Sequence, residues 1–426
     1  MAQGGRYDAA VIDIELVASS MENKINSHQL SLSADHCIFR TPSILARHKK
    51  EAYSPNCFSF GPFHHDQPNL KVTEKIKLKY LRGLLSRSGN QQAMLRECLD
   101  SIKEEERKAR DCYAGIIDQN MVEAKNFVEM LVVDGCFIIE LFRKDANVVP
   151  REDDDPIFSM SCMLQFLHHD LILLENQIPW LVLELLFNKT KASFETKSLI
   201  ELALNFLANT FSSNRPSLNL DLFVGQEVKH ILDLLRLSLV LPSEVVNNDR
   251  QKLEWQPIPS ATRLKEAGVK FVRVTVDSIL DMKFRNGVLE IPSLLIQETT
   301  ETIFRNLISY EQCLPNCKPI FTSYAKIMDN LIDTTNDMEI LCKKDIFDNW
   351  LSPEDATQFF NKLYNDTYVK EFYYSELCVN LNHHCQQWWP KWRSAYVHNY
   401  FSKPWAIAAQ IYAIIMFILT LWQSFK

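Results

Sequence analysis

Apolar residues recur at the three- and four-residue spacing of amphipathic helices along most of the 426-residue chain. This pattern extends over residues 73–241 and again over residues 301–400. Between these stretches, at 269–291, the pattern changes to one that favours strands, and Asn286-Gly287 is a residue pair preferred in two-residue hairpin turns. The pattern therefore predicts a mainly α protein with a small antiparallel β element, which is an α+β fold.

The domain organisation follows from the same pattern. Residues 1–35 show little periodicity, and we expect them to form a flexible N-terminal lead-in with one short helix. Residues 36–400 are long enough for a large globular domain with a helical, a β and a second helical part. We expect the centre of this domain in two strongly apolar helices at 127–142 and 157–187, because their internal charges are too many for a lipid span.

The segment 405–422 reads WAIAAQIYAIIMFILTLW and contains no charged residue. Eighteen helical residues rise about 27 Å, which is close to the thickness of the hydrocarbon core of a bilayer. Trp405 and Trp422 stand at its two ends, where aromatic rings favour the headgroup level, and Tyr412 lies between them. The segment predicts a transmembrane helix with the lipid bilayer as its partner, and the alternative is a buried core helix.

The charges around this segment predict an orientation. Lys391, Arg393 and Lys403 precede it and only Lys426 follows it, so the positive-inside tendency favours a cytosolic domain. The eleven cysteines and the absence of a secretory pattern suit the same side. We therefore expect a single-pass protein with a C-terminal anchor in the plasma membrane or an endomembrane, with the bulk of the chain cytosolic.

Composition argues against several classes of function. The net charge is −7, which disfavours a nucleic-acid partner because such binding needs a basic surface. Only ten glycines are present, and the chain lacks the GxGxxG, GxxxxGK[ST] and GxSxG patterns of nucleotide-binding loops and serine hydrolases. We therefore expect no cofactor.

Two segments have residue types that bind metal ions. Cys378, His383, His384 and Cys385 are ligand types for zinc, but no second pair stands at zinc-finger spacing. The acidic run 151–156 resembles part of a calcium loop but lacks its spaced ligands and central glycine. We expect no metal site, with free cysteines and a solvated acidic loop in these two places.

Two histidine-rich groups of residues are candidates for a catalytic site. One is His64-His65-Asp66, and the other is His168-His169-Asp170, which is followed by Glu175, Asn176 and Gln177. Imidazole next to carboxylate suits general acid–base catalysis, so His64, His65, His168, Asp170 and Glu175 are candidate catalytic residues. On a helix, however, residues 168–170 point in three directions. The alternative is that these polar groups pair with buried backbone ends near Pro179, where helical hydrogen bonds are interrupted.

A third polar group comprises Glu301, Arg305 and Glu311-Gln312. Glu301 and Arg305 are one helical turn apart and can form an ion pair. We interpret the group as an internal brace of the fold.

Several strings of the sequence resemble the plant family called "domain of unknown function 247". Among them are CIFRTPSILARHKKEAYSPNCFSFGPFHH, VVDGCFIIELF, HHDLILLENQIPWLVLELLF, TETIFRNLISYEQC and YFSKPWAI. The resemblance implies a land-plant protein with a largely helical soluble domain and a C-terminal membrane anchor, and it implies no chemistry. Glu175, Asn176, Gln177, Glu301 and Arg305 lie within these strings, and we interpret them as a structural family motif.

These observations lead to one functional hypothesis with two alternatives. The chain is interpreted as a membrane-anchored plant protein that acts as an interaction or recognition module at a membrane surface and binds an unidentified protein partner. The first alternative is an enzyme of plant specialised metabolism with His, Asp and Glu as acid–base residues. The second is a purely structural membrane component.

Overall fold

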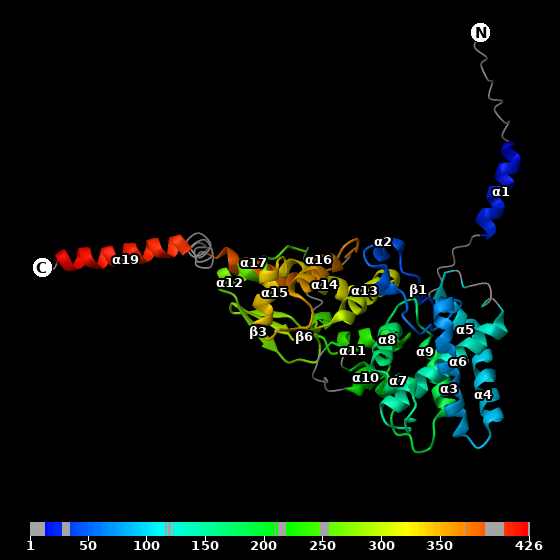
Figure 1. The fold of residues 1–426 in the computed structure, drawn as a ribbon. Helices are drawn as coiled ribbons and strands as arrows, with labels where there is room; N and C mark the ends of the chain where they lie inside the picture. Colours follow the sequence, from blue (N-terminus) through cyan, green and yellow to red (C-terminus); the bar gives the residue numbers. More distant parts are fainter. Residues whose placement is uncertain are drawn as a thin grey trace, which may run out of the picture.

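The computed structural model describes residues 13–27, 35–115, 117, 121, 123–208, 210–211, 219–247, 255–369, 371–387 and 404–424. Most of the described elements are helices, and they form a body with small sheets (Figure 1). Two helices, α1 (Ile14–Ser27) and α19 (Pro404–Ser424), lie apart from that body on different sides of it.

Helix α6 (Ala124–Asp145) is the centre of the first half of the body. Its sequence is apolar on almost every face, as expected of a helix surrounded by others. Its main neighbours are α3 (Lys71–Ser86), α4 (Gln91–Glu104), α9 (Trp180–Thr190) and α10 (Leu199–Leu207). Gly135 lets α9 approach closely, because a Cβ atom there would lie 2.4 Å from Cδ1 of Leu186.

Short elements connect and cover this bundle. They are β1 (Ile38–Phe39), α2 (Ser43–Ala46), η1 (Lys50–Tyr53), η2 (Pro68–Leu70), α5 (Glu106–Asp111), β2 (Tyr113–Ala114), α7 (Pro156–Ser159), α8 (Ser161–Leu171), η4 (Leu220–Phe223), α11 (Ile231–Val240) and η5 (Glu244–Asn247). Helices α4 and α5 both end before β2, so the helical pattern predicted over residues 73–241 is interrupted there by a short strand.

The second half is arranged around α13 (Glu298–Cys313), most of whose side chains are buried. Its other helices are α12 (Ala261–Glu266), α14 (Ile320–Leu331), α15 (Thr335–Cys342), α16 (Pro353–Leu363) and α17 (Ser375–Gln386). Phe304 of α13 stacks on Tyr324 of α14 with ring centroids 5.7 Å apart. Buried apolar side chains form one cluster that extends from Cys37 to Leu381, so both halves share a core.

The predicted hairpin is confirmed. Strands β4 (Lys283–Arg285) and β5 (Val288–Pro292) are antiparallel, and the two residues between them have positive φ, 51° for Asn286 and 78° for Gly287. Positive φ at both central positions is what a type I′ turn requires.

The expectation of a purely antiparallel β element is wrong. Strand β3 (Lys270–Val274) pairs with β5 in parallel, so the sheet order is β3-β5-β4. Two further two-stranded pairs are also parallel: β1 with β2, and β6 (Leu294–Ile296) with β7 (Phe347–Asn349). Parallel partners need a crossover and are set by the packing of the body, so local sequence does not reveal them.

The prediction of a C-terminal transmembrane helix is also wrong. None of the helices in the described part of the chain is long and apolar enough to cross a membrane. Tyr412 and Trp422 are exposed, whereas the side chain of Trp405 and residues 388–403 lie outside the described residues.

The hairpin turn generates a test of the β element. Gly287→Val should lower the free energy of unfolding by about 1–2 kcal/mol, because a β-branched residue is strained at positive φ. The new Cβ atom would also lie 3.3 Å from Cε1 of His384. Urea denaturation measures the change. The control is Gly83→Val in α3, where a Cβ atom meets nothing within 4 Å; equal losses in both variants would contradict this account of the turn.

Candidate functional site

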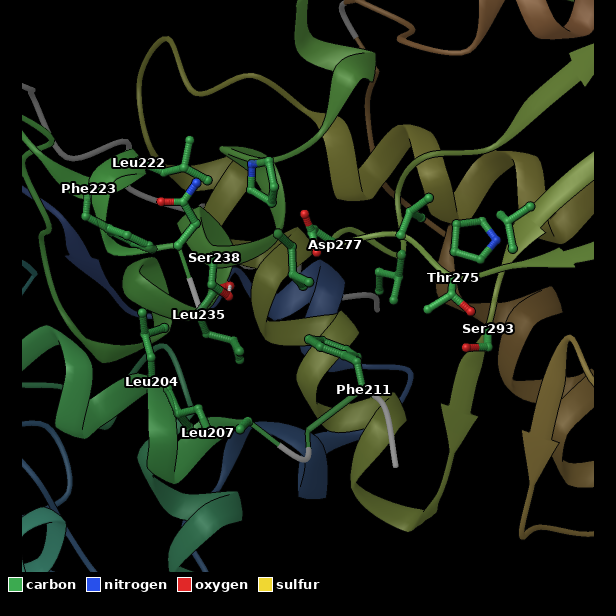
Figure 2. A pocket seen from close by; sticks show the side chains of 18 of the residues that line it. Leu204, Leu207, Phe211, Leu222, Phe223, Leu235, Ser238, Thr275, Asp277 and Ser293 are labelled. Atoms are coloured by element: carbon green, nitrogen blue, oxygen red, sulfur yellow. Dashed lines mark hydrogen bonds between the residues drawn. The ribbon is translucent and has the colours of Figure 1, made fainter. Parts of the chain in front are cut away.

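A pocket of about 350 Å³ opens between α10, α11 and the chain that follows β3 (Figure 2). Its walls are mostly leucine and phenylalanine side chains, among them Leu204, Leu207, Phe211 and Leu235. None of the residues that the sequence pattern singles out as candidate chemistry lines this pocket. The predicted polar residues occupy a different place in the molecule.

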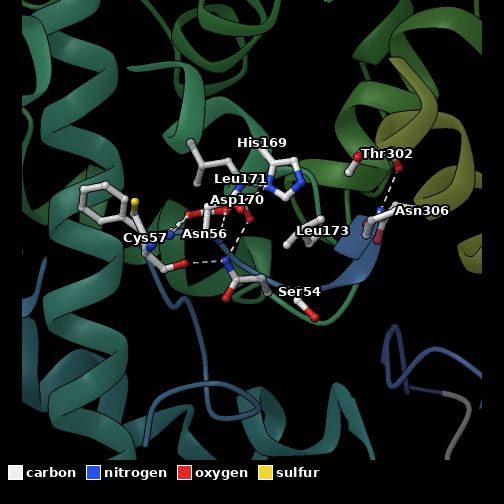
Figure 3. Close-up of polar contacts among 12 residues, drawn as sticks. Ser54, Asn56, Cys57, His169, Asp170, Leu171, Leu173, Thr302 and Asn306 are labelled. Atoms are coloured by element: carbon white, nitrogen blue, oxygen red, sulfur yellow. Dashed lines mark hydrogen bonds and ion pairs between the residues drawn. The ribbon is translucent and has the colours of Figure 1, made fainter. Parts of the chain in front are cut away.

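That place is the segment from Asn56 to Gly61, which belongs to no helix or strand and is buried from Phe58 onward. Asp170, at the end of α8, accepts hydrogen bonds from the backbone N–H groups of Asn56, Cys57 and Phe58 at 2.7, 2.8 and 2.8 Å (Figure 3). The Asp170 side chain is fully buried. A buried backbone amide must find a partner, and here one carboxylate serves three of them.

Asn176 continues this pairing along the same segment. Its Oδ1 atom accepts from the N–H of Phe60 at 2.7 Å, and its Nδ2 atom donates to the carbonyls of Phe58 and Asp170. Because both ends of the amide are used, Asn176 links the irregular segment to the end of α8.

Gln177 joins three other parts of the body. Its Nε2 atom donates to the carbonyls of Leu171 and Leu173, which have lost helical partners beyond the end of α8. Its Oε1 atom accepts from the N–H of Leu232 in the first turn of α11 at 3.2 Å. The side chain therefore pairs backbone ends of two helices at once.

A buried ion pair holds the far end of the segment. Asp134 of α6 accepts from the N–H of Gly61 at 2.9 Å and from Nζ of Lys77 at 2.7 Å. Lys77 also donates to the carbonyl of Ser59. Gly61 has φ of 73°, and a Cβ atom there would lie 2.4 Å from the carbonyl oxygen of Gln177, so only glycine fits.

Glu175 and His64 come together, as the acid–base hypothesis requires, with Oε2 and Nε2 3.7 Å apart. Burial lowers the pKa of His64 to about 4, and the positive charge of Arg40 adds to the effect. Burial raises the pKa of Glu175. Gln67 donates to Nδ1 of His64 at 2.7 Å, so the neutral imidazole carries its proton on Nε2, facing Glu175. The pair is therefore a neutral histidine beside a carboxyl group.

The other histidines of the two groups do not join this pair. His168 stacks on Phe206 of α10 with ring centroids 4.0 Å apart, and burial lowers its pKa to about 4. His169 lies beside Asp170 and Asn56. His65 is half-buried next in sequence to His64. His168 thus has a different neighbour from His169 and Asp170, which contact each other and Asn56.

The third polar group supports helices of the second half. Glu301 pairs with Arg305 at 2.8 Å, as the spacing predicts, and also with Lys49. Glu311 accepts from the first three backbone N–H groups of α14 and from Arg236. Burial raises the pKa of Glu311, while its hydrogen bonds and Arg236 oppose that effect. This carboxylate neutralises the positive end of α14.

Sequence reasoning missed His230, which is fully buried at the N-terminus of α11. Its Nδ1 atom accepts from the N–H of Asp233 at 3.2 Å, and its Nε2 atom lies 3.0 Å from the carbonyl of Cys37. Burial lowers the pKa of His230 to about 3. The signal was Asp233 three residues further on, which accepts from the N–H of Lys229 in a reciprocal cap, but histidine is uncommon as the capping residue.

Two segments of the sequence have residue types that bind metal ions. Within the described ranges, no group of three or more His, Cys, Asp or Glu side chains is placed to hold a metal ion. All eleven cysteines are free thiols. In the acidic run 151–156, Asp155 is buried rather than solvated: it accepts from Tyr80 and Lys144 and caps α7.

The sequence of this chain matches a plant protein family whose function is unknown. Residues 38–419 match the model of the family described as "Plant protein of unknown function" (DUF247), and the chain belongs to this family. It is 25% identical to UPF0481 protein At3g47200 of Arabidopsis thaliana over 91% of this chain and 85% of that protein. It is 21% identical to the putative UPF0481 protein At3g02645 of the same plant, over 96% of this chain and 93% of the other. No solved structure matches the chain significantly.

The contacts of Gln177 generate a stability prediction. Gln177→Ala should lower the free energy of unfolding by at least about 2 kcal/mol, because two backbone groups, the carbonyl of Leu171 and the N–H of Leu232, lose their partner. The carbonyl of Leu173 keeps its hydrogen bond from the N–H of Asn176. Chemical denaturation followed by circular dichroism measures the loss. Gln165→Ala, on the exposed face of α8, is the matched control and should change stability by less than about 0.5 kcal/mol. A loss for Gln177→Ala no larger than the control's would show that this amide does not hold the helix ends.

The stacked histidine generates a pH prediction. Since the pKa of His168 is about 4 in the folded chain and 6.5 when unperturbed, the unfolded chain binds the extra proton first as the pH falls. Its contribution to stability is complete above about pH 6.5 and is lost between pH 6.5 and 4. His168→Phe keeps the stacking with Phe206 but has no imidazole to protonate. From pH 7.5 to pH 5 its free energy of unfolding should therefore fall by about 1–2 kcal/mol less than that of the parent.

Denaturation curves at the two pH values test this, and differences between variant and parent remove the effect of the buried carboxylates. His383→Phe, on the exposed side of α17, is the control and should keep the parent's dependence on pH. If His168→Phe also kept it, His168 would not be the group that titrates.

Proposed function

We propose that the protein is a protein–protein interaction module and that α1 is the segment that binds the partner. The observation that carries the proposal is the exposed apolar stripe of α1. Helix α1 lies apart from the body, so nothing in the described part of the chain covers this stripe (Figure 1).

The stripe follows from apolar residues spaced three and four residues apart along the helix. Ile14, Val17, Met21 and Ile25 fall within about 80° of one another around the helix axis, at 100° per residue. Their exposed fractions are 71%, 43%, 56% and 68%. Asn23 lies on the opposite side of the helix. An apolar face of this kind, with anchors one turn apart, is the form in which a helix binds a groove of another protein.

The length of α1 supports the same conclusion. A helix of 14 residues is marginally stable in water by itself, because the free energy gained by a few helical turns barely offsets the unfavourable free energy of nucleation. Burial of its apolar face in a groove would supply the missing stabilisation. The partner is thus a protein with an apolar groove about three turns long.

The charges of α1 favour protein over lipid. Glu15 and Glu22 lie on one flank of the stripe, and Lys24 is the sole basic residue of the helix. Helices that bind membrane surfaces carry lysine and arginine on the polar face, because the lipid surface is negative. A groove with basic residues along one rim complements the two glutamates.

The enzyme alternative has less support. Asp170 is fully engaged with three backbone amides, and Glu175 accepts from the N–H of Thr41 at 2.9 Å. The described pocket of about 350 Å³ has none of the candidate acid–base residues on its walls. The His64–Glu175 pair resembles an acid–base site, but neither residue lines this pocket.

Site-specific photocrosslinking in plant cells tests the proposal. A photoreactive residue at Met21 should give a discrete protein adduct, whereas the same residue at Asn23, on the opposite face, should not. Val17→Lys should reduce the Met21 adduct at least tenfold, because a charge in the groove is costly, and Ser20→Lys, on the polar face, should leave it unchanged. Equal adducts at Met21 and Asn23 would contradict the proposal. A lipid adduct at Met21 would replace it with a membrane-surface role.

A further inference from the structure

The pocket between α10, α11 and the end of β3 has two chemically different sides (Figure 2). Leu204, Leu207 and Leu235 form one wall with Phe211 and Phe223, and this wall is apolar. The other side carries Thr275, Asp277 and Ser293 among apolar residues such as Val276 and Ile279. The apolar wall belongs to helices of the shared core, so it is part of a rigid frame.

Two charged residues on the pocket wall have no assigned role in the fold. The side chains of Arg273 and Asp277 form no ion pair or hydrogen bond with other residues in the described part of the chain. Both residues are exposed, so the Asp277 carboxylate can accept a hydrogen bond from a molecule in the pocket. Because the two charges are opposite, a ligand with a net charge would be attracted by one and repelled by the other. This arrangement favours an uncharged ligand.

The size of the pocket sets the class of ligand. A volume of about 350 Å³ lies in the range of small-molecule sites. Small-molecule sites combine an apolar lining with a few polar groups that fix orientation, and this pocket has both.

We propose that this pocket binds an uncharged small molecule with an apolar, ring-containing body and one hydroxyl or amine donor. The apolar body lies against the leucine and phenylalanine wall, and the donor faces Asp277. The hydroxyls of Thr275 and Ser293 lie on the same side and provide further hydrogen-bond partners. This inference is independent of the role proposed for α1, because the two places share no residue.

The probe for the test is N-phenyl-1-naphthylamine, a neutral fluorescent compound with an apolar ring system and one N–H group. Its emission rises in apolar surroundings, so titration of the full chain measures binding. The expected result is saturable binding of one probe per chain. The N-methyl derivative of the probe, which lacks the N–H group, should bind about three- to tenfold more weakly, the value of one hydrogen bond.

Two variants locate the binding. Ser238→Phe adds a ring to the pocket wall and should lower the affinity for the probe at least tenfold. Its matched control is Ser101→Phe in α4, where the serine hydroxyl also donates to a carbonyl of its own helix at 2.7 Å. Asp277→Ala should abolish the difference between the probe and its N-methyl derivative while leaving binding of the derivative unchanged.

Thermal unfolding of each variant shows whether it is folded, and Asp277→Ala, at an exposed position, gives an answer even if Ser238→Phe fails to fold. The proposal would be overturned by absence of saturable binding, which would mean that the pocket is closed in solution. Equal binding by the parent, Ser238→Phe and Ser101→Phe would also overturn it, because the probe would then be bound elsewhere, for example on the exposed side chains of α19. The donor assignment fails if Asp277→Ala preserves the preference for the N–H probe.

Discussion

The structure depends on how a buried segment without regular secondary structure satisfies its backbone. Residues 56–61 form no helix or strand and are buried from Phe58 onward, so their N–H groups need partners that a neighbouring strand does not supply. Asp170, Asn176 and Asp134 provide them from α6 and from the end of α8 and the turn that follows it. The first half of the fold is therefore held together by a few side chains that each serve several backbone groups. Leaving such groups unpaired would cost about 1–3 kcal/mol each.

This constraint also decides which residues are available for chemistry. Histidine next to carboxylate suggests catalysis in a sequence, yet here most of these groups bind the backbone, and Asp170 is the clearest case. His64 and Glu175 lie together, but burial keeps the imidazole neutral, and a glutamine occupies its other nitrogen. Burial and hydrogen bonding thus give these residues a structural setting that their types alone do not reveal.

The places where the molecule can engage others have ordinary residue types. The stripe of α1 consists of aliphatic side chains, and the pocket wall is leucine and phenylalanine. Neither stands out in a sequence whose hydrophobic content is 46%, because the same residues fill the core. Exposure in the folded chain is what distinguishes them from core residues. The residues whose types suggest catalysis and the surfaces whose shape suits binding therefore lie in different parts of this protein.

The sequence by itself determined the local features. Helical spacing located most helices, Asn286-Gly287 located the hairpin because its turn requires positive φ at adjacent residues, and the spacing of Glu301 and Arg305 located their ion pair. Only the tertiary structure decided the rest. The parallel strand pairs join segments far apart in the chain, and the partners of Asp134 and His230 come from distant loops. An apolar run such as that of α19 did not by itself settle whether a helix can span a membrane. Local sequence fixes backbone preference, whereas burial and long-range pairing depend on how the whole chain packs.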